Sequence, residues 1–257
     1  MLINQTIEKM RQLRLKAMAD EFYRQMELPA MDALDFEQRL GMLIDVEWLF
    51  KENQKIKRLC REANLRFPES CFADLSYQPA RKLDRSYIAR LSDLAWMKEG
   101  KNIIITGCTG TGKTYLACAF GAEACRRQFR VKYYRVGRLL HEMSVAFGDG
   151  SYHQLLKKLN NVELLILDDW GLAMMNVFES GHLLEIMEER YGQKSTVISA
   201  QLPVARWHEL YEDSTVADAV LDRMVHNAYR FELEGPSLRR SDALLTMNGG
   251  EPNGEGV

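Results

Sequence analysis

The segment Gly107–Thr114 reads GCTGTGKT, and it constrains the fold of this chain more than any other part of the sequence. It fits the pattern G-x-x-x-x-G-K-[ST], follows the apolar run Ile103–Ile105, and precedes a helix-like stretch that begins at Tyr115. A strand, a glycine loop and a helix in this order form a phosphate cradle, because backbone N–H groups and the positive end of the helix dipole point at one anion. The sequence therefore predicts a bound nucleoside triphosphate, and a chance glycine turn is the alternative.

The residue types of this loop predict separate roles. Lys113 is expected to reach the β- and γ-phosphates, and Thr114 is expected to place its hydroxyl on a magnesium ion. The predicted cofactors are therefore ATP and Mg²⁺. The residues predicted to contact the nucleotide are Gly107, Cys108, Thr109, Gly110, Thr111, Gly112, Lys113, Thr114 and Tyr115.

Composition limits the class of protein. The 257 residues are 46% hydrophobic and 27% charged, which is ordinary for a globular protein, and no apolar run reaches the ~18 residues that would span a membrane. The N-terminus has helical apolar spacing and no signal-peptide pattern. Five cysteines form no C-x-x-C pair, which favours the reduced thiols of a cytoplasmic protein over a disulfide or zinc framework. With a formal net charge of −2, contacts to nucleic acid must come from local basic patches.

The chain divides into segments of different pattern. Apolar residues at helical spacing predict an all-helical N-terminal domain over residues 1–66. We expect this domain to contact a partner or DNA. Prolines at positions 68 and 79 break helices, so residues 67–98 are predicted to be a linker that packs on the following domain. That domain is expected to cover residues 99–241. The glycine-rich remainder, 242–257, is predicted to be disordered.

From residue 101, strand-like and helical runs alternate, which predicts an α/β domain with a mostly parallel five-stranded sheet. The expected strands are 102–106, 131–136, 162–168, 196–199 and 229–233. The expected helices are 113–126, 137–147, 177–191 and most of 205–227. Ligands of such sheets bind at the carboxyl ends of the strands, where the glycine loop already lies.

Two acidic residues, Asp168 and Asp169, follow the apolar run Leu164–Leu167. Four consecutive apolar residues are typical of a strand in a sheet that is covered on both faces, so the acids should emerge beside the glycine loop. Asp168 is predicted to hold the magnesium ion, directly or through water. Asp169 is predicted to be the base or water-orienting group for attack on the γ-phosphate. A helix N-cap is the alternative role for either acid.

A polar side chain just after the fourth strand could lie between these acids and the γ-phosphate. Gln201 is the first candidate and Ser199 is the second. A simple turn before Pro203 is the alternative.

Arg223 lies in a helical run just before the last strand and is predicted to be an arginine that a neighbouring subunit supplies to the transition state. The alternative is a surface ion pair with Asp218 or Asp222, which would contribute little to stability. Arg239 and Arg240 could contact phosphate or form a solvated basic end. The predicted catalytic residues are thus Asp169, Gln201 and Arg223, and the predicted metal ligands are Thr114 and Asp168.

Together these segments resemble the IstB family of AAA+ ATPases, relatives of the DnaC helicase loader. The resemblance rests on DFEQRLGMLIDVEW, KNIIITGCTGTGKTYLACAFGAEA, LLILDDWG, VISAQLPVARW and ADAVLDRMVHNAYRFELEGPSLRR. It implies an AAA+ module behind a helical N-terminal region, self-assembly into a homo-oligomer on double-stranded DNA with ATP, and assistance to a transposase from the same mobile element. In that family the position of Arg223 is the arginine finger. The position of Gln201 is usually asparagine and that of Asp169 is often glutamate, and these departures concern hydrolysis more than binding.

The leading hypothesis is therefore a DNA-binding ATPase that assists a transposase. A replicative helicase loader is the second hypothesis. A small-molecule kinase and a non-hydrolysing ATP switch are the others, although the kinase would need a lid insertion that the sequence does not show. The candidates for DNA contact are Lys157, Lys158 and the basic run Lys51–Arg66, for which a solvated helix face is the alternative.

Overall fold

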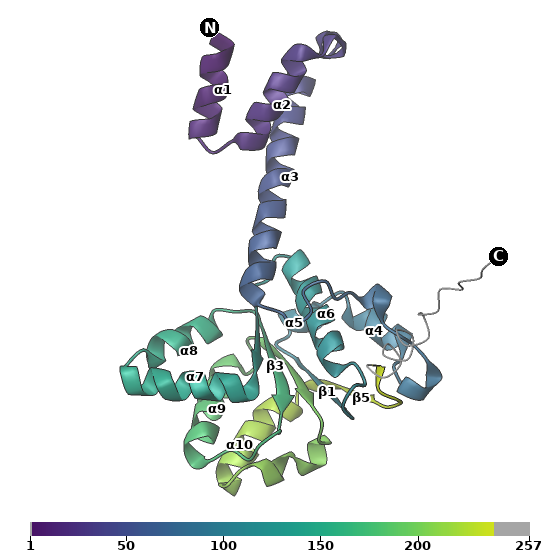
Figure 1. Ribbon diagram of the computed structural model, residues 1–257, viewed down its shortest axis with the longest axis vertical. Coiled ribbons are helices and arrows are strands. Elements are labelled where there is room, and N and C mark those ends of the chain that lie inside the picture. Colours follow the sequence, from purple (N-terminus) through teal and green to yellow (C-terminus); the bar gives the residue numbers. More distant parts are fainter. Residues whose placement is uncertain (1, 239–257) are drawn as a thin grey trace, which may run out of the picture. The chain divides into compact units, whose positions relative to one another are not determined.

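The computed structural model describes residues 2–238. The chain divides into two compact units, and the division falls between Arg58 and Leu59 (Figure 1). The first unit holds α1 (Leu2–Gln12), α2 (Lys16–Glu27), the short 3₁₀ helix η1 (Pro29–Ala33) and the first part of α3 (Phe36–Ala63). Within it, the buried Glu47 of α3 accepts a hydrogen bond from the Met18 N–H of α2 at 2.9 Å. The predicted helical character of this region is confirmed.

A linker region opens the second unit. It contains η2 (Phe72–Asp74), η3 (Pro79–Arg81), α4 (Arg85–Leu91) and α5 (Ala95–Lys98). Two of its aromatic rings pack on Phe120, with centroid distances of 4.9 Å for Phe72 and 5.9 Å for Trp96. The linker is therefore part of the core of this unit. The proposed domain limits at residues 66 and 98 stay predictions.

The five-stranded sheet is parallel throughout and has the strand order β2-β3-β4-β1-β5, as the predicted fold class requires. The strands are β1 (Asn102–Gly107), β2 (Val131–Arg135), β3 (Leu164–Trp170), β4 (Ser195–Ala200) and β5 (Ala228–Leu233). The remaining elements are α6 (Lys113–Arg126), α7 (Val136–Asp149), α8 (Tyr152–Asn160), α9 (Val177–Arg190), η4 (Val204–Leu210) and α10 (Ser214–Val225).

Two local features differ from the expectations. Residues 152–160 form a helix of their own, α8, because Gly150 in a left-handed conformation ends α7. The third strand continues past Asp168 to Trp170. The expectation that most of 205–227 is helical is confirmed by two helices, η4 and α10, and Asp213 caps the start of α10 by accepting hydrogen bonds from the Thr215 and Val216 N–H groups.

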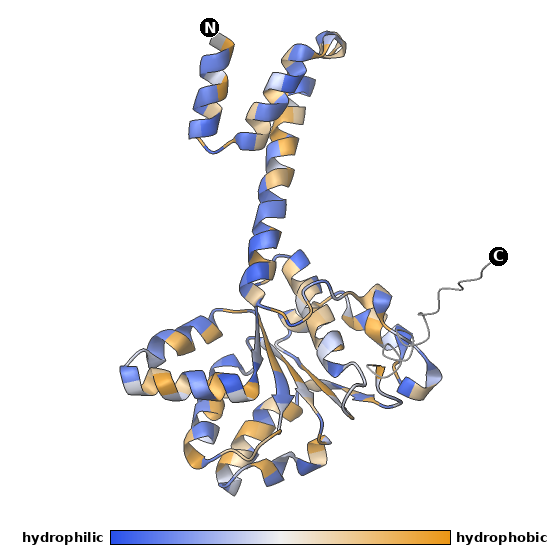
Figure 2. Cartoon of the chain, in the orientation of Figure 1, coloured by the Kyte–Doolittle hydropathy of each residue, from blue (hydrophilic) through white to orange (hydrophobic). Residues whose placement is uncertain are grey.

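The sheet separates two hydrophobic cores, and Figure 2 shows the strands as predominantly hydrophobic. Along β1, Ile103 and Ile105 face the core formed with α6 and the linker, whereas Ile104 faces the core formed with α7, α9 and α10. Successive strand residues point to opposite faces, so both faces must be covered. No helix within residues 2–238 combines the length and apolar character needed to cross a membrane.

Candidate functional site

The glycine loop between β1 and α6 has a backbone that only glycine fits. Gly107, Gly110 and Gly112 have φ angles of 146°, 86° and 90°. A Cβ on Gly107 would lie 2.2 Å from the carbonyl oxygen of Leu233, and one on Gly112 would lie 2.7 Å from Nη2 of Arg81. The motif glycines are therefore required by backbone geometry as well as by the approach of a phosphate.

Side chains within and beneath the loop hold its shape. Lys113 Nζ and Thr111 Oγ1 both donate hydrogen bonds to the carbonyl oxygen of Cys108, at 2.9 Å and 2.8 Å. From the linker, the buried Arg81 donates to the carbonyl oxygen of Thr111, and burial lowers the pKa of this guanidinium. Since Lys113 opens α6, its ammonium group lies where the loop and the helix N-terminus converge.

Asp168 lies at the carboxyl end of β3, beside the glycine loop, as the sequence predicted. It is fully buried and accepts hydrogen bonds from Thr114 Oγ1 at 3.0 and 3.1 Å and from the Tyr133 hydroxyl at 2.7 Å. Ser199 is the third hydroxyl donor to this carboxylate. Burial, followed by the bond to Asp168, raises the pKa of Tyr133, so this side chain stays a donor at neutral pH. A buried carboxylate needs such partners.

The adjoining Thr114 hydroxyl and Asp168 carboxylate fit a magnesium ion. Both offer hard oxygen ligands, and Mg²⁺ in nucleotide sites is held by one or two protein groups together with phosphate and water. The part of the chain that the structure describes contains no cluster of three or more His, Cys, Asp or Glu residues that would form a complete metal cage. The two donors suit a metal ion whose other ligands are phosphate and water.

Asp169 lies in a bulge of β3. The pairing of β3 with β4 shifts by one residue between Leu167 and Trp170, and Asp169 has a φ of 59°. Asp is among the residues that tolerate this left-handed conformation. The bulge sends the two acids in different directions, and Asp169 accepts a hydrogen bond from Arg135 Nε at 2.7 Å.

A cavity of about 540 Å³, called the nucleotide cavity below, lies beside the glycine loop. Gln201 lines it together with Lys113, Thr114 and Asp169. Ser199, the second candidate for that role, is buried and bonded to Asp168 instead. Gln201 is thus the polar residue after β4 that faces the cavity.

Sequence reasoning missed several lining residues of this cavity: Arg66, Phe67, Arg135, Leu172 and Leu238. No local motif marks them, because they reach the loop from four different segments. Leu238 is held there by a hydrogen bond from its N–H to the carbonyl oxygen of Gly110 at 3.0 Å. The bulky pair Arg66–Phe67 just before Pro68 is the one signal that could have drawn attention.

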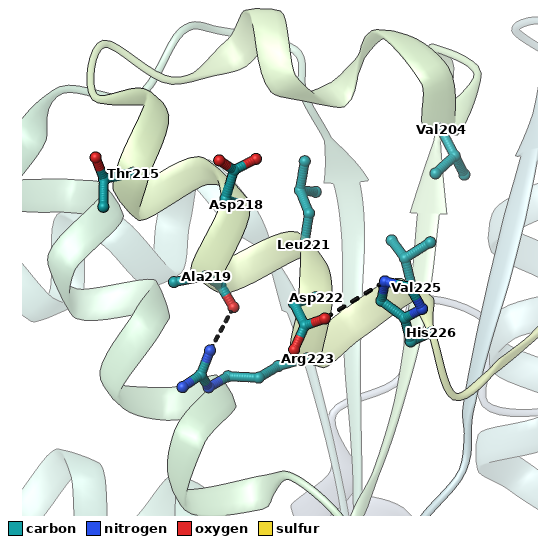
Figure 3. A pocket seen from close by; sticks show the side chains of 9 residues that line it. All are labelled: Val204, Thr215, Asp218, Ala219, Leu221, Asp222, Arg223, Val225 and His226. Carbon is teal, nitrogen blue, oxygen red and sulfur yellow. Dashed lines mark hydrogen bonds and ion pairs between the residues drawn. The ribbon is translucent and has the colours of Figure 1, made fainter.

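Arg223 does not line the cavity of its own loop. It lies on α10 beside a separate hollow of about 640 Å³ (Figure 3). Its Nη1 donates to the carbonyl oxygen of Ala219 at 2.8 Å, a bond drawn in Figure 3, and its Nη2 pairs with Glu188 of α9 at 2.6 Å. The ion-pair partner is therefore Glu188 rather than Asp218 or Asp222. Arg239 and Arg240 lie outside the described residues.

The parallel sheet, the glycine loop before α6 and the buried acid at the end of β3 define an AAA+ module with a phosphate-binding loop. Solved structures show the same fold. The DnaC helicase loader matches with a TM-score of 0.52 at 22% identity, covering 58% of this chain and 87% of that one. The replication initiator DnaA, bound to AMPPCP and single-stranded DNA, matches with a TM-score of 0.57 at 20% identity, covering 70% of this chain and 56% of that one.

Sequence comparison identifies the family. Residues 8–245 match the family described as IstB-like ATP binding protein, and this chain belongs to that family. A Sinorhizobium fredii (strain NGR234) protein whose name describes an insertion sequence ATP-binding protein, y4pL, is 42% identical over 94% of this chain and 98% of its own length. The corresponding ATP-binding protein of insertion sequence IS1162 from Pseudomonas fluorescens is 40% identical over 79% of this chain and 88% of its own length. The predicted resemblance is confirmed, and this is an ATP-binding protein.

Proposed function

We propose that this protein hydrolyses ATP, with Mg²⁺, at interfaces between its own copies. The observation that carries the proposal is the position of Arg223. It lies beside a different hollow from the cavity that holds Lys113 and Asp169, which supports a role at the nucleotide of a second copy rather than at its own. A contact in which one copy contributes Lys113 and the next contributes Arg223 is head-to-tail, and repeated head-to-tail contacts build rings or helical assemblies.

The roles of the residues follow from their surroundings. Lys113 and the loop N–H groups would bind the phosphates, and Thr114 and Asp168 would hold the metal, which neutralises charge between the β- and γ-phosphates when bound. Asp169 would accept a proton from the attacking water, with Gln201 helping to orient that water. Arg223 of a neighbouring copy would leave Glu188 and stabilise the charge on the transferred phosphoryl group.

A mixing experiment tests the shared site. Arg223→Ala should bind ATP normally but lose hydrolysis by ~10³-fold or more, and Asp169→Asn should also bind ATP and be inactive. A one-to-one mixture should recover activity at about a quarter of its interfaces, where an intact Asp169 meets an intact Arg223. A mixture as inactive as its components, while the unmixed wild type is active, would place Arg223 outside the shared site.

We further propose that the assembly binds double-stranded DNA and assists a transposase. The support is the family and the naming of its similar relatives as insertion sequence proteins. DNA affinity measured with a non-hydrolysable ATP analogue should fall steeply as salt rises, because each phosphate contact releases counterions. Affinity that is insensitive to salt would contradict the proposal.

A replicative helicase loader is the second candidate, favoured by the fold shared with DnaC. The two candidates differ in partner and share the ATPase. Affinity purification of the tagged protein from its host should recover a transposase under the first proposal and a replicative helicase under the second.

A further inference from the structure

A third hollow, of about 720 Å³ and distinct from the nucleotide cavity and the hollow beside Arg223, lies at the opposite end of β2 from the glycine loop. Three segments far apart in sequence form it: the end of α3 with the residues after it, the start of β2, and α8. Five of the side chains that line it are basic, and Glu62 is its one acidic side chain among the described residues. The basic side chains are Arg61, Arg130, Lys132, Lys157 and Lys158.

Most of this positive charge is not neutralised by the protein. Arg130 is paired with Glu163 at 2.8 Å, and Lys132 Nζ donates to the Glu62 carbonyl oxygen at 3.0 Å. Arg61, Lys157 and Lys158 are exposed, and no ion pair within residues 2–238 involves any of them.

The cations are close enough to affect one another. Burial lowers the pKa of Lys132, the positive charge of Lys158 lowers it further, and the carboxylates of Glu142 and Glu62 act in the opposite direction. A bound anion would relieve this repulsion.

The hollow also continues along an open edge of the sheet. β2 is an edge strand, and an adjoining smaller hollow shares Asn64, Lys132 and Lys158 with the larger one and adds Arg135 and Arg138. Arg135 and Arg138 are ion-paired with Asp169 and Glu142, so the cations of the groove without an ion pair among residues 2–238 are those of the larger hollow.

We propose that this basic groove, defined by Arg61, Lys132, Lys157 and Lys158, binds the phosphate backbone of DNA. The inference rests on the proposed function, and it assigns the DNA contact to one face of the second unit. A cluster of basic side chains beside an open sheet edge, three of them exposed and without an ion pair among residues 2–238, suits a polyanion. The structural alternative is that Lys157 and Lys158 only stabilise the C-terminal end of α8, whose last turn they occupy.

Charge reversal separates the two interpretations. The double variant Lys157→Glu/Lys158→Glu should bind DNA at least about tenfold more weakly and reduce the slope of log affinity against log salt by about 2, since each phosphate contact contributes about 0.9. ATP affinity should be unchanged, because neither residue lines the nucleotide cavity. Arg61→Glu, on a different element of the groove, should weaken DNA binding in the same way.

The matched control is Arg90→Glu/Lys98→Glu. These two residues are exposed and occupy the last turns of α4 and α5, so the control makes the same charge change at two helix ends outside the groove. It should bind DNA like the wild type.

The outcomes separate the groove from the proposed function. If the wild type binds DNA and the Lys157/Lys158 and Arg61 variants bind it equally well, the groove assignment is wrong while the proposed function stands. Equal losses in the control and in the groove variants would also overturn the assignment. If the groove variants lose binding to polyglutamate but keep DNA, the groove takes an acidic peptide instead. If the wild type binds no DNA with any nucleotide, both proposals fall.

Discussion

At the residue scale, the neighbours Asp168 and Asp169 are given different surroundings. Asp168 is fully buried under three hydroxyl donors, whereas the Asp169 side chain is 22% exposed and pairs with the exposed Arg135. The first environment suits a carboxylate with a fixed position. The second environment suits a carboxylate that changes partner, because exposed ion pairs contribute only ~0.2–1 kcal/mol to stability.

Arg135→Gln should therefore raise the basal rate of ATP hydrolysis at saturating ATP, a condition that is needed because Arg135 also lines the nucleotide cavity. The removed ion pair occupies Asp169, and its small free energy limits the increase to about fivefold. The measurement is steady-state phosphate release in the absence of DNA. Arg138→Gln is the control, since Arg138 is a nearby exposed arginine that pairs with Glu142 instead. Loss of hydrolysis in Arg135→Gln would show that the pair supports Asp169 rather than restraining it.

Cysteine reactivity gives a second prediction at this scale. Burial raises the pKa of Cys118 to about 11 and that of Cys125 to about 12, so both remain poorly reactive thiols, whereas Cys108 is exposed in the glycine loop. N-ethylmaleimide should modify Cys108 before these two and abolish ATP binding, and bound ATP should slow the reaction. Peptide mass spectrometry measures the order of modification. Cys108→Ser should bind ATP and resist the reagent; inactivation of this variant at the wild-type rate would contradict the prediction.

At the scale of elements, a tight turn at the start of the linker presents an aromatic ring to the nucleotide cavity. The Phe67 carbonyl oxygen accepts hydrogen bonds from both the N–H and the hydroxyl of Ser70. The Phe67 ring lies 5.8 Å from that of Tyr115 on α6, whose hydroxyl contacts Asp74 and the Cys71 N–H. The turn is thus held on α6 while the Phe67 ring remains 38% exposed.

We expect this ring to stack on the base of ATP. Stacking of a base on an aromatic side chain is worth ~1–3 kcal/mol, so Phe67→Ala should weaken ATP binding by at least about fivefold, and Phe67→Tyr should bind normally. Calorimetry with ATP and with inorganic tripolyphosphate measures the difference, because only ATP carries a base. Phe147→Ala, at an exposed ring on α7, should change neither affinity. An equal loss of both ligands in Phe67→Ala would indicate a distorted loop rather than lost stacking.

At the scale of the whole molecule, the strand order places the glycine loop and Arg223 at different surfaces. β1 lies between β4 and β5, and its carboxyl end opens into the nucleotide cavity, while α10 presents Arg223 beside its own hollow. Within one copy the two lie at different hollows, and the head-to-tail contact that we propose between copies would bring them together.

Assembly should therefore depend on a bound nucleotide. Lys113→Ala removes the ammonium group at the phosphate site and should abolish both ATP binding and the larger species that the wild type forms with ATP. Sedimentation velocity with and without ATP measures the change. Lys98→Ala, at an exposed lysine on α5, should assemble normally. Lys113→Ala that assembles like the wild type would separate assembly from nucleotide binding.

The fold class, the glycine loop and the acidic strand end could be predicted because each is a local pattern. Apolar runs, glycines that need positive φ angles, and the alternation of strands and helices are encoded within short segments of the chain. Their order alone implies a parallel sheet with the loop and the acids at one edge. For the same reason, the omission of α8, which follows the left-handed Gly150, is a local error that left the sheet prediction intact.

The sequence by itself thus determined the class of sheet and which residues form the glycine loop and the acidic strand end. Only the tertiary structure decided which partners those residues have: Tyr133 and Ser199 on Asp168, Arg135 on Asp169, Glu188 on Arg223, and Phe67 at the cavity. These contacts join residues that lie dozens of positions apart in the sequence. They depend on strand order, on a one-residue bulge and on how helices pack across the sheet, and no short segment contains that information.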